Sequence, residues 1–239
     1  MRYIYGPVKS RRLGLSLGVS LTLHKTCNFD CLYCQLGRTP VKTQKRGEYI
    51  KAEDIIEEVK LWFEHNPSQA AQLDFVTISG SGEPTLNIKI GELIQEIRKI
   101  TPARLAVITN ASLLSDAALR SELLGADLLV PSLDAVIPSV FERIDRPHPG
   151  IKIEDIKNGL VAFRKEFKGE IWLEVMLVRG INDDLRYIKK LKEAVDLIRP
   201  DKVQLNSPVR TTAECGTLPV DKYKLNKIKS ILGENCEII

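Results

Sequence analysis

Three cysteines in one short segment are the residues of this chain best suited to chemistry. Cys27, Cys31 and Cys34 follow a C-x3-C-x2-C spacing, and the 239-residue chain contains only five cysteines. Three thiolates so close together can ligate a metal ion or an iron–sulfur cluster. Structural zinc sites use four ligands, usually as two separated pairs, and ferredoxin loops supply a cysteine to every iron of a cubane. A loop with only three cysteines would instead leave one iron of a four-iron cluster without a protein ligand.

The cysteine loop resembles the cluster-binding loop of the radical S-adenosylmethionine (SAM) enzymes. The resemblance rests on the incomplete set of cysteines and on the aromatic Tyr33 just before the last of them. It implies a [4Fe-4S] cluster held by Cys27, Cys31 and Cys34, whose open iron is chelated by the amino and carboxylate groups of SAM. It also implies that an electron from a reducing protein such as ferredoxin or flavodoxin cleaves SAM to methionine and a 5'-deoxyadenosyl radical, which abstracts hydrogen from a substrate.

The two remaining cysteines leave other uses of the loop open. A fourth ligand from Cys215 or Cys236 would complete a zinc or ferredoxin-like site. The protein would then be an iron–sulfur electron carrier or a zinc-binding module without affinity for SAM. The odd number of cysteines, three of them in one loop, fits reduced thiols better than a disulfide framework.

Length and composition favour one domain over residues 1–239. The chain is 44% apolar, which suffices for one sizeable core. No run approaches 18 consecutive apolar residues, and the N-terminus lacks the apolar stretch of a signal peptide, so we expect a cytoplasmic protein without membrane contact. Residues 1–15 are expected to be an irregular lead-in, and residues 27–50 the cluster loop followed by a long basic loop.

Positive charge is concentrated in the first fifth of the chain. Residues 1–51 contain ten lysines and arginines and two acidic residues, although the whole chain has a net charge of +4. A basic rim beside the cysteine loop could attract an anionic partner such as RNA. The same charges could instead serve the cluster and the SAM carboxylate, or be solvated. The basic residues are Arg2, Lys9, Arg11, Arg12, Lys25, Arg38, Lys42, Lys45, Arg46 and Lys51.

Six apolar segments alternate with six amphipathic ones along the rest of the chain. The expected strands are residues 16–23, 74–80, 104–110, 127–134, 171–178 and 202–207. The expected helices are residues 52–65, 87–100, 115–124, 153–168, 183–198 and 219–232. This alternation favours parallel strands joined by right-handed crossovers. We therefore predict an α/β fold whose parallel sheet forms an open, partial (βα)6 TIM-like barrel, which the radical SAM resemblance also implies.

The polar segment after residues 74–80 is a second candidate site. Its glycines permit close approach of the backbone to a ligand, and Glu83 offers a fixed carboxylate to a cation. The run Gly80-Ser81-Gly82-Glu83 resembles the glycine-glycine-glutamate motif of radical SAM enzymes, with serine in the middle position. The resemblance implies that this backbone and the Glu83 carboxylate hold the amino group of SAM.

Polar residues also end the other expected strands, and the carboxyl ends of barrel strands meet at the edge where active sites are built. Their hydroxyl, amide and carboxylate groups suit the ribose hydroxyls and the methionine carboxylate of SAM. These residues are Thr109, Asn110, Ser132 and Asp134. Asn206 could contact adenine, and Tyr33 resembles the aromatic residue that contacts adenine in the family. Each is also an ordinary turn or cap residue.

Two residues are tentative catalytic groups. Glu174 interrupts an apolar strand, and a buried carboxylate needs a partner. It either faces the barrel interior and binds SAM or substrate, or pairs with an internal lysine or arginine for structural reasons. Cys215 follows the last expected strand, where it could be a hydrogen-atom donor, a ligand or a bystander.

Three segments together resemble the iron–sulfur oxidoreductase branch of radical SAM proteins, which is related to the tRNA wyosine-synthesis enzymes. They read YGPVKSRRLG, KTCNFDCLYCQLGRT and SGSGEPTLN. The resemblance implies a modified guanine in tRNA as the substrate. The chain lacks the N-terminal cysteine trio of the wyosine synthases, so the substrate is left open. An activating enzyme that generates a glycyl radical on a partner protein shares the cysteine spacing and barrel, which makes a protein substrate the alternative.

Overall fold

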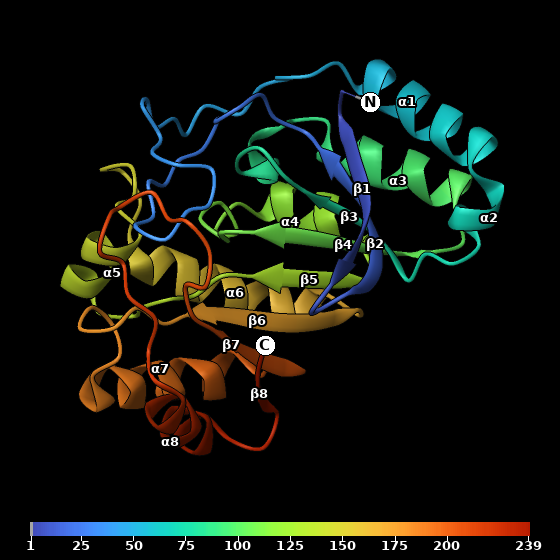
Figure 1. Ribbon diagram of the computed structural model, residues 1–239. Helices are drawn as coiled ribbons and strands as arrows, with labels where there is room; N and C mark the ends of the chain where they lie inside the picture. The colour runs from blue at the N-terminus through green and yellow to red at the C-terminus, as the bar shows by residue number, and fades with distance from the viewer. Residues whose placement is uncertain (1) are drawn as a thin grey trace.

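Eight strands form a sheet that curls into an open barrel, with helices against its outer face (Figure 1). The computed structural model describes residues 2–239. The strands are β1 (Ile4–Ser10), β2 (Gly14–Ser20), β3 (Phe75–Ser79), β4 (Arg104–Thr109), β5 (Leu128–Pro131), β6 (Glu170–Met176), β7 (Lys202–Asn206) and β8 (Cys236–Ile238). They lie in this order, β1 is antiparallel to β2, and all later neighbours are parallel. The predicted open, partial barrel is confirmed.

Each strand from β2 to β7 is followed by at least one helix, which gives six βα units. The helices are α1 (Ala52–His65), α2 (Pro67–Ala70), the 3-10 turn η1 (Pro84–Leu86), α3 (Ile90–Ile100), α4 (Ala117–Leu123), α5 (Pro138–Ile144), α6 (Ile153–Glu166), α7 (Leu185–Ile198) and α8 (Lys222–Leu232). All six predicted strands and all six predicted helices are present. The parallel strands therefore all point toward the same edge, at the left of Figure 1.

Strands β3 to β6 are largely buried on both faces of the sheet because most of their residues are apolar. Along β3, Val76 and Ile78 belong to the large core between sheet and helices, whereas Phe75 belongs to a small cluster on the inner face. Trp172 of β6 meets Phe75 edge to face within this inner cluster, with ring centroids 6.3 Å apart. Alternate residues of a strand point to opposite faces, so these strands read as continuous apolar runs rather than as alternating ones.

The prediction that residues 1–15 are irregular is wrong for most of this segment, although residue 1 lies outside the described residues. Residues 4–10 form β1 and residues 14 and 15 begin β2, and the two strands pair as an antiparallel hairpin. The sequence concealed this strand because Gly6 and Pro7 interrupt it and only Ile4 is buried. The register shifts at this point, and an edge strand tolerates a proline because the missing N–H is not needed for pairing.

Four further elements were not predicted: β8, α5, α2 and the 3-10 turn η1. α2 and η1 have four and three residues, and β8 has only three, too few for a periodic pattern. α5 has seven residues and lies in a connection that contains several prolines and arginines. No helix of residues 2–239 is both long enough and apolar enough to span a membrane.

Candidate active site

The cysteine loop and the glycine-rich segment lie side by side at the carboxyl edge of the sheet. The loop follows β2 and the glycine-rich segment follows β3, and these two strands pair in parallel up to Ser20 and Ser79. Beyond the strands, Thr26 and Gly82 form an isolated parallel bridge. The amide of Glu83 donates to the Thr26 carbonyl at 2.9 Å. The two motifs that the sequence singled out are thus in direct contact.

Backbone hydrogen bonds hold the cysteine loop against the end of α5. The amide of Asp30 donates to the carbonyl of Asp145 at 3.1 Å, and the amide of Leu32 donates to the carbonyl of Ile144 at 2.9 Å. The loop is therefore fixed on one side by residues 26 and 82 and on the other by α5. These backbone contacts on both sides of the loop fix the place of its three thiols.

The three thiols fit an iron–sulfur cluster better than a single metal ion. Each is half-buried, and the Sγ atom of Cys27 accepts from the Phe29 amide at 3.4 Å and from Asn110 Nδ2 at 3.9 Å. Such N–H donors tune the thiolates of iron–sulfur clusters. Within residues 2–239, no three His, Cys, Asp or Glu side chains are placed to hold one metal ion. A mononuclear zinc site has no geometrical support there.

Burial makes the bare thiolates unfavourable. Desolvation, and next the charge of Glu83, raises the pKa of Cys27 to about 12. Desolvation, and next the charge of Asp145, raises the pKa of Cys31. Thiolates at these positions need a strongly positive partner, and the irons of a cluster supply one. Cys27, Cys31 and Cys34 fit the [4Fe-4S] cluster that they are predicted to hold, and this assignment stays a prediction.

Glu83 is buried and accepts four hydrogen bonds from the protein. Its Oε1 atom accepts from the Thr85 amide at 3.1 Å and from the Thr85 and Thr109 hydroxyls at 2.6 Å each. Its Oε2 atom accepts from the Asn110 amide at 2.8 Å. Desolvation raises the pKa of Glu83 despite these bonds. The carboxylate therefore ties the end of β3 to the end of β4, and contact with the SAM amino group stays a prediction.

The two glycines of the motif are required by the backbone. Gly80 has a φ of 114°, a region that favours glycine. A Cβ atom on Gly82 would lie 1.8 Å from the carbonyl oxygen of Thr26. The close approach of the two loops therefore depends on the absence of a side chain at position 82.

Gly82→Ala should separate the cysteine loop from residues 80–83. Because the clash is with a backbone atom, no side chain can move to relieve it, and we expect a loss of about 3 kcal/mol in the free energy of unfolding, at the upper end for overpacking. Iron content after reconstitution should fall with it. Gly47→Ala is the control, since a Cβ atom there meets nothing nearer than 3.9 Å. Denaturation and iron content that are the same in both variants would contradict this account.

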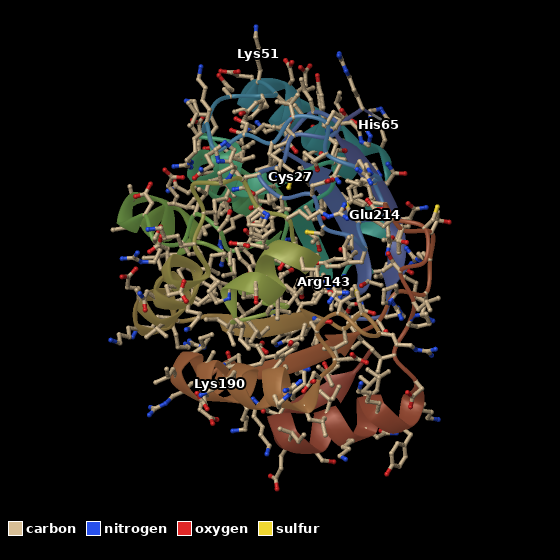
Figure 2. The ribbon with its side chains drawn as sticks, turned by 90° about the vertical axis from the view of Figure 1, so that its left-hand side faces the viewer. Cys27, Lys51, His65, Arg143, Lys190 and Glu214 are labelled. Carbon is tan, nitrogen blue, oxygen red and sulfur yellow. The ribbon has the colours of Figure 1, made fainter. Side chains whose placement is uncertain are left out.

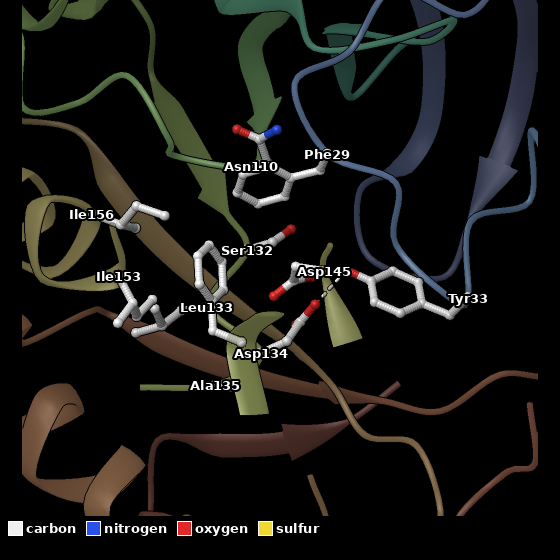
Figure 3. Close-up of a pocket in the computed structure, with 11 residues that line it drawn as sticks. Phe29, Tyr33, Asn110, Ser132, Leu133, Asp134, Ala135, Asp145, Ile153 and Ile156 are labelled. Carbon is white, nitrogen blue, oxygen red and sulfur yellow. Dashed lines mark hydrogen bonds between the residues drawn. The ribbon is translucent and has the colours of Figure 1, made fainter. Parts of the chain in front are cut away.

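Tyr33 is held by two buried carboxylates, as Figure 3 shows. Its hydroxyl donates to Asp134 and lies 3.5 Å from Asp145. Asp134 also accepts from the amide of Met176 at 2.7 Å. Desolvation raises the pKa of Tyr33 and of Asp134, and raises that of Asp145 to about 6. Asp145 was not predicted, because it lies in the connection after α5, far along the sequence from any motif.

Four predicted SAM contacts gather around one pocket beside the cysteine loop. Tyr33, Asn110, Ser132 and Asp134 all line it (Figure 3). Asn110 also donates to Asn28 at 2.7 Å. Asn28 is fully buried inside the cysteine motif and was not predicted, although a polar residue between two ligand cysteines is a usable signal. The amide of Ser81, another predicted SAM contact, donates to the hydroxyl of Ser20 at the end of β2, at 3.3 Å.

Glu174 forms an ion pair inside the open barrel. Its carboxylate is 2.5 Å from the guanidinium of Arg12 and accepts from Asn206 Nδ2 at 3.2 Å. Arg12 belongs to the turn between β1 and β2, so the pair connects the first hairpin with β6. Of the two readings of Glu174, pairing with an internal arginine is the arrangement observed. A contact of Glu174 with SAM or substrate, and one of Asn206 with adenine, stay predictions.

Removing one member of this ion pair should cost more than replacing both. Arg12→Ala leaves Glu174 buried without a cation and should lower the free energy of unfolding by about 3 kcal/mol. The double variant Arg12→Met/Glu174→Leu should lose less, because no charge is left unpaired. Urea denaturation of both proteins provides the comparison. A double variant that is less stable than Arg12→Ala would contradict a structural role for the pair.

Cys215 is exposed on the loop that follows β7. This loop packs on the cysteine motif, since the amide of its residue Glu214 donates to the Leu32 carbonyl at 3.1 Å. Cys215 thus lies beside the cluster loop, and its role stays a prediction. Cys236 is buried in β8, at the edge of the sheet.

Five of the ten residues in the basic rim predicted for residues 1–51 make contacts within the protein. Arg12, Arg38 and Arg46 form ion pairs with Glu174, Glu214 and Glu122, respectively. Lys25 donates to the carbonyl of Gly37, and Lys42 donates to the carbonyls of Arg146 and Pro147. The structure therefore favours an internal use of these five charges over a free surface for RNA.

A family model supports the class of protein that this fold and site define. The model of the radical SAM superfamily matches residues 21–191, which include the cysteine loop and residues 80–83. The chain belongs to the radical SAM superfamily, a family of enzymes that use a [4Fe-4S] cluster and SAM.

Three relatives of similar sequence match most of this chain. A UPF0026 protein of Methanocaldococcus jannaschii is 35% identical over 234 residues, covering 98% of this chain and 72% of the relative. A UPF0026 protein of Synechocystis is 40% identical over 212 residues, covering 87% of this chain and 76% of the relative. A Brachyspira hyodysenteriae protein named GTPase Obg is 40% identical over 235 residues, or 98% of this chain, but the chain spans only 34% of that protein.

Solved structures share the fold at low sequence identity. A radical SAM methyltransferase from Sphaerobacter thermophilus superposes with a TM-score of 0.72 at 17% identity, over 94% of this chain and 65% of that one. Archaeal TYW1 superposes with a TM-score of 0.60 at 21% identity, over 92% of this chain and 72% of that one. Identities this low show the fold alone.

Proposed function

We propose that the protein cleaves SAM reductively and uses the resulting 5'-deoxyadenosyl radical to abstract a hydrogen atom from a tRNA substrate. The observation that carries the first part is the contact between the three-cysteine loop and residues 80–83 at the carboxyl edge of the open barrel. That contact puts the groups expected to hold the cluster beside those expected to hold SAM.

The proposed reaction balances with one external electron. A [4Fe-4S] cluster held by Cys27, Cys31 and Cys34 would supply the one-electron chemistry, and a reducing protein such as ferredoxin or flavodoxin would supply the electron. The bond between C5' and sulfur breaks, which gives methionine and the 5'-deoxyadenosyl radical. The radical takes one hydrogen atom from the substrate, which leaves 5'-deoxyadenosine and a substrate radical.

The residues of the chain position SAM and exclude water in this proposal. Gly80 and Gly82 bring the backbone of residues 80–83 against the cysteine loop, where it can meet the SAM amino group. The phenol of Tyr33 is fixed by Asp134, which sets its ring beside the pocket that SAM would enter. Phe29 and Leu133 line the same pocket and make it partly apolar, but its volume is only about 10 Å³, so an adenine ring would enter only if the lining side chains moved.

The tRNA part of the proposal rests on resemblance. The sequence resembles the branch related to the wyosine-synthesis enzymes, and archaeal TYW1 shares the fold. A relative named probable GTP 3',8-cyclase, from Saccharolobus islandicus, is 29% identical over 154 residues, or 62% of this chain. These relatives support a guanine-containing substrate.

Substrate-dependent turnover tests this part. Reconstituted and reduced protein is incubated with SAM and with tRNA isolated from cells, which carries modified guanosines, and 5'-deoxyadenosine is measured with and without the RNA. The proposal predicts a several-fold stimulation by tRNA and a change in the mass of a guanosine in the RNA digest. Absence of both would contradict tRNA as the substrate.

The alternative is the activation of a glycyl radical enzyme. A domain of pyruvate-formate lyase-activating enzyme from Bacteroides vulgatus shares the fold, with a TM-score of 0.55 at 20% identity over 68% of this chain. A glycyl radical detected by electron paramagnetic resonance on a partner protein, with no response to tRNA, would favour this alternative.

A further inference from the structure

A second cavity borders the cysteine loop on the side of β6 and β7. Its volume is about 300 Å³, which lies at the lower end of the range for small-molecule sites. Leu32 of the cysteine loop, the end of α5, the residues after β6 and the loop after β7 form its walls. Figure 2, which looks onto the carboxyl edge of the sheet, shows Arg143 and Glu214 on the same face as Cys27. A ligand here would lie next to the cluster loop.

The charge of this cavity is strongly positive. Its lining contains Arg143, Arg146 and Arg179 against one acidic residue, Glu214. Glu214 is already neutralised, because Arg146 donates to it at 2.6 Å and Arg38 also pairs with it. The hydrogen bond from Arg146 accordingly lowers the pKa of Glu214. The lining therefore retains the charges of Arg143 and Arg179 in excess.

Arg143 and Arg179 have no side-chain partner within the part of the chain that the structure describes. They come from different elements, since Arg143 lies in the last turn of α5 and Arg179 follows β6. Other arginines at this edge are paired, as Arg38 and Arg146 are with Glu214. Arg143 and Arg179 are both exposed and line one cavity from separate elements, and two unpaired arginines so placed suit a multivalent anion with several acceptor oxygens.

We propose that this cavity binds a phosphate group of the substrate, with Arg143 and Arg179 as its cationic contacts. The proposal rests on the proposed function only in taking the bound molecule to be the substrate. A phosphate held here would anchor the substrate beside Leu32, which lies between Cys31 and Cys34 in the sequence. The adjoining part of the substrate would then reach the radical. The phosphate could belong to RNA or to a free nucleotide, and the chemistry of recognition is the same.

Binding measurements on the reconstituted holoprotein test the proposal without turnover. The probes are inorganic pyrophosphate, which stands for the phosphate alone, and a tRNA transcript. The variants are Arg143→Gln, Arg179→Gln and the two combined. Arg11→Gln is the matched control, because Arg11 is exposed, has no side-chain partner within residues 2–239 and lies in the β1–β2 turn at the opposite edge of the sheet.

Each single variant should raise the Kd of a bound probe about tenfold, the effect of losing one charge-assisted hydrogen bond. For tRNA, the slope of log Kd against log salt concentration should also fall by about one for each lost contact. Iron content and the spectral change on adding SAM should be unchanged. Arginine-dependent binding of pyrophosphate points to the phosphate of a free nucleotide, and arginine-dependent binding of tRNA alone points to RNA.

Two results would overturn the phosphate site. One is that neither probe binds the wild-type holoprotein. The other is that the combined variant binds both probes as tightly as Arg11→Gln does. Both are distinct from failure of the proposed function, which would appear as absence of 5'-deoxyadenosine from SAM whatever the phosphate affinity.

Discussion

Replacing Cys31 with alanine should abolish the formation of 5'-deoxyadenosine from SAM and leave the barrel folded. Cys31 is one of three expected cluster ligands, and the loss of one thiolate opens a second iron and releases the cluster. The loop itself is anchored by backbone bonds of its neighbours Asp30 and Leu32 to the end of α5, which the substitution does not touch. Iron analysis, circular dichroism and chromatography of the SAM products measure the three effects.

The control for this variant is Cys236→Ala. Cys236 is also a buried cysteine, but it lies in β8 at the far edge of the sheet. This substitution should cost a little stability through the lost packing and leave iron content and SAM cleavage as in the wild type. Undiminished cleavage in Cys31→Ala, or equal loss in the two variants, would contradict the assignment of the cluster to this loop.

Glu83→Ala should weaken both the fold and SAM binding. The carboxylate accepts four hydrogen bonds, from Thr85, Thr109 and Asn110. Its removal leaves these buried donors without an acceptor, and we expect a loss of about 3 kcal/mol in the free energy of unfolding. SAM affinity should fall more than iron content does, because the loosened segment is the one proposed to contact SAM. Urea denaturation and equilibrium dialysis with SAM provide the two values.

Glu83→Gln separates the shape of this side chain from its acceptor capacity. The amide keeps one carbonyl oxygen and puts a donor where the second carboxylate oxygen was, so it should lose roughly half as much stability as the alanine variant. A Glu83→Ala protein within about 0.5 kcal/mol of the wild type, a difference typical of neutral surface changes, would contradict the role of Glu83 as the tie between β3 and β4.

The fold could be predicted because each βα unit has a recognisable pattern of apolar residues in its strand and its helix. β3 and β4 are short apolar runs buried on both faces, and α3 has its isoleucines and leucines on one side. β1 could not be predicted in the same way. An edge strand with one buried residue and an internal proline has no periodicity, and its pairing with β2 depends on tertiary contacts.

The candidate site could be predicted only in part. The cysteine spacing and residues 80–83 are local motifs, and the structure brings them together. The partners of their side chains are distant in sequence. Arg12 pairs with Glu174 across the open barrel, and Asp145 lies beside Tyr33. The spacing of residues within a short segment of sequence cannot reveal either contact. The role of Glu83 as a hydrogen-bond acceptor could not be predicted either, because it depends on the buried donors packed around the carboxylate.

Formation of 5'-deoxyadenosine by the wild-type protein is the most direct test of the central claim. The protein is reconstituted anaerobically with iron and sulfide, reduced with dithionite and incubated with SAM, and electron paramagnetic resonance of the cluster is recorded beside the product analysis. The account predicts a spectrum that changes when SAM is added, and equal amounts of 5'-deoxyadenosine and methionine. The account would be contradicted by a fully reconstituted, reduced cluster whose electron paramagnetic resonance spectrum does not change when SAM is added and which forms no 5'-deoxyadenosine.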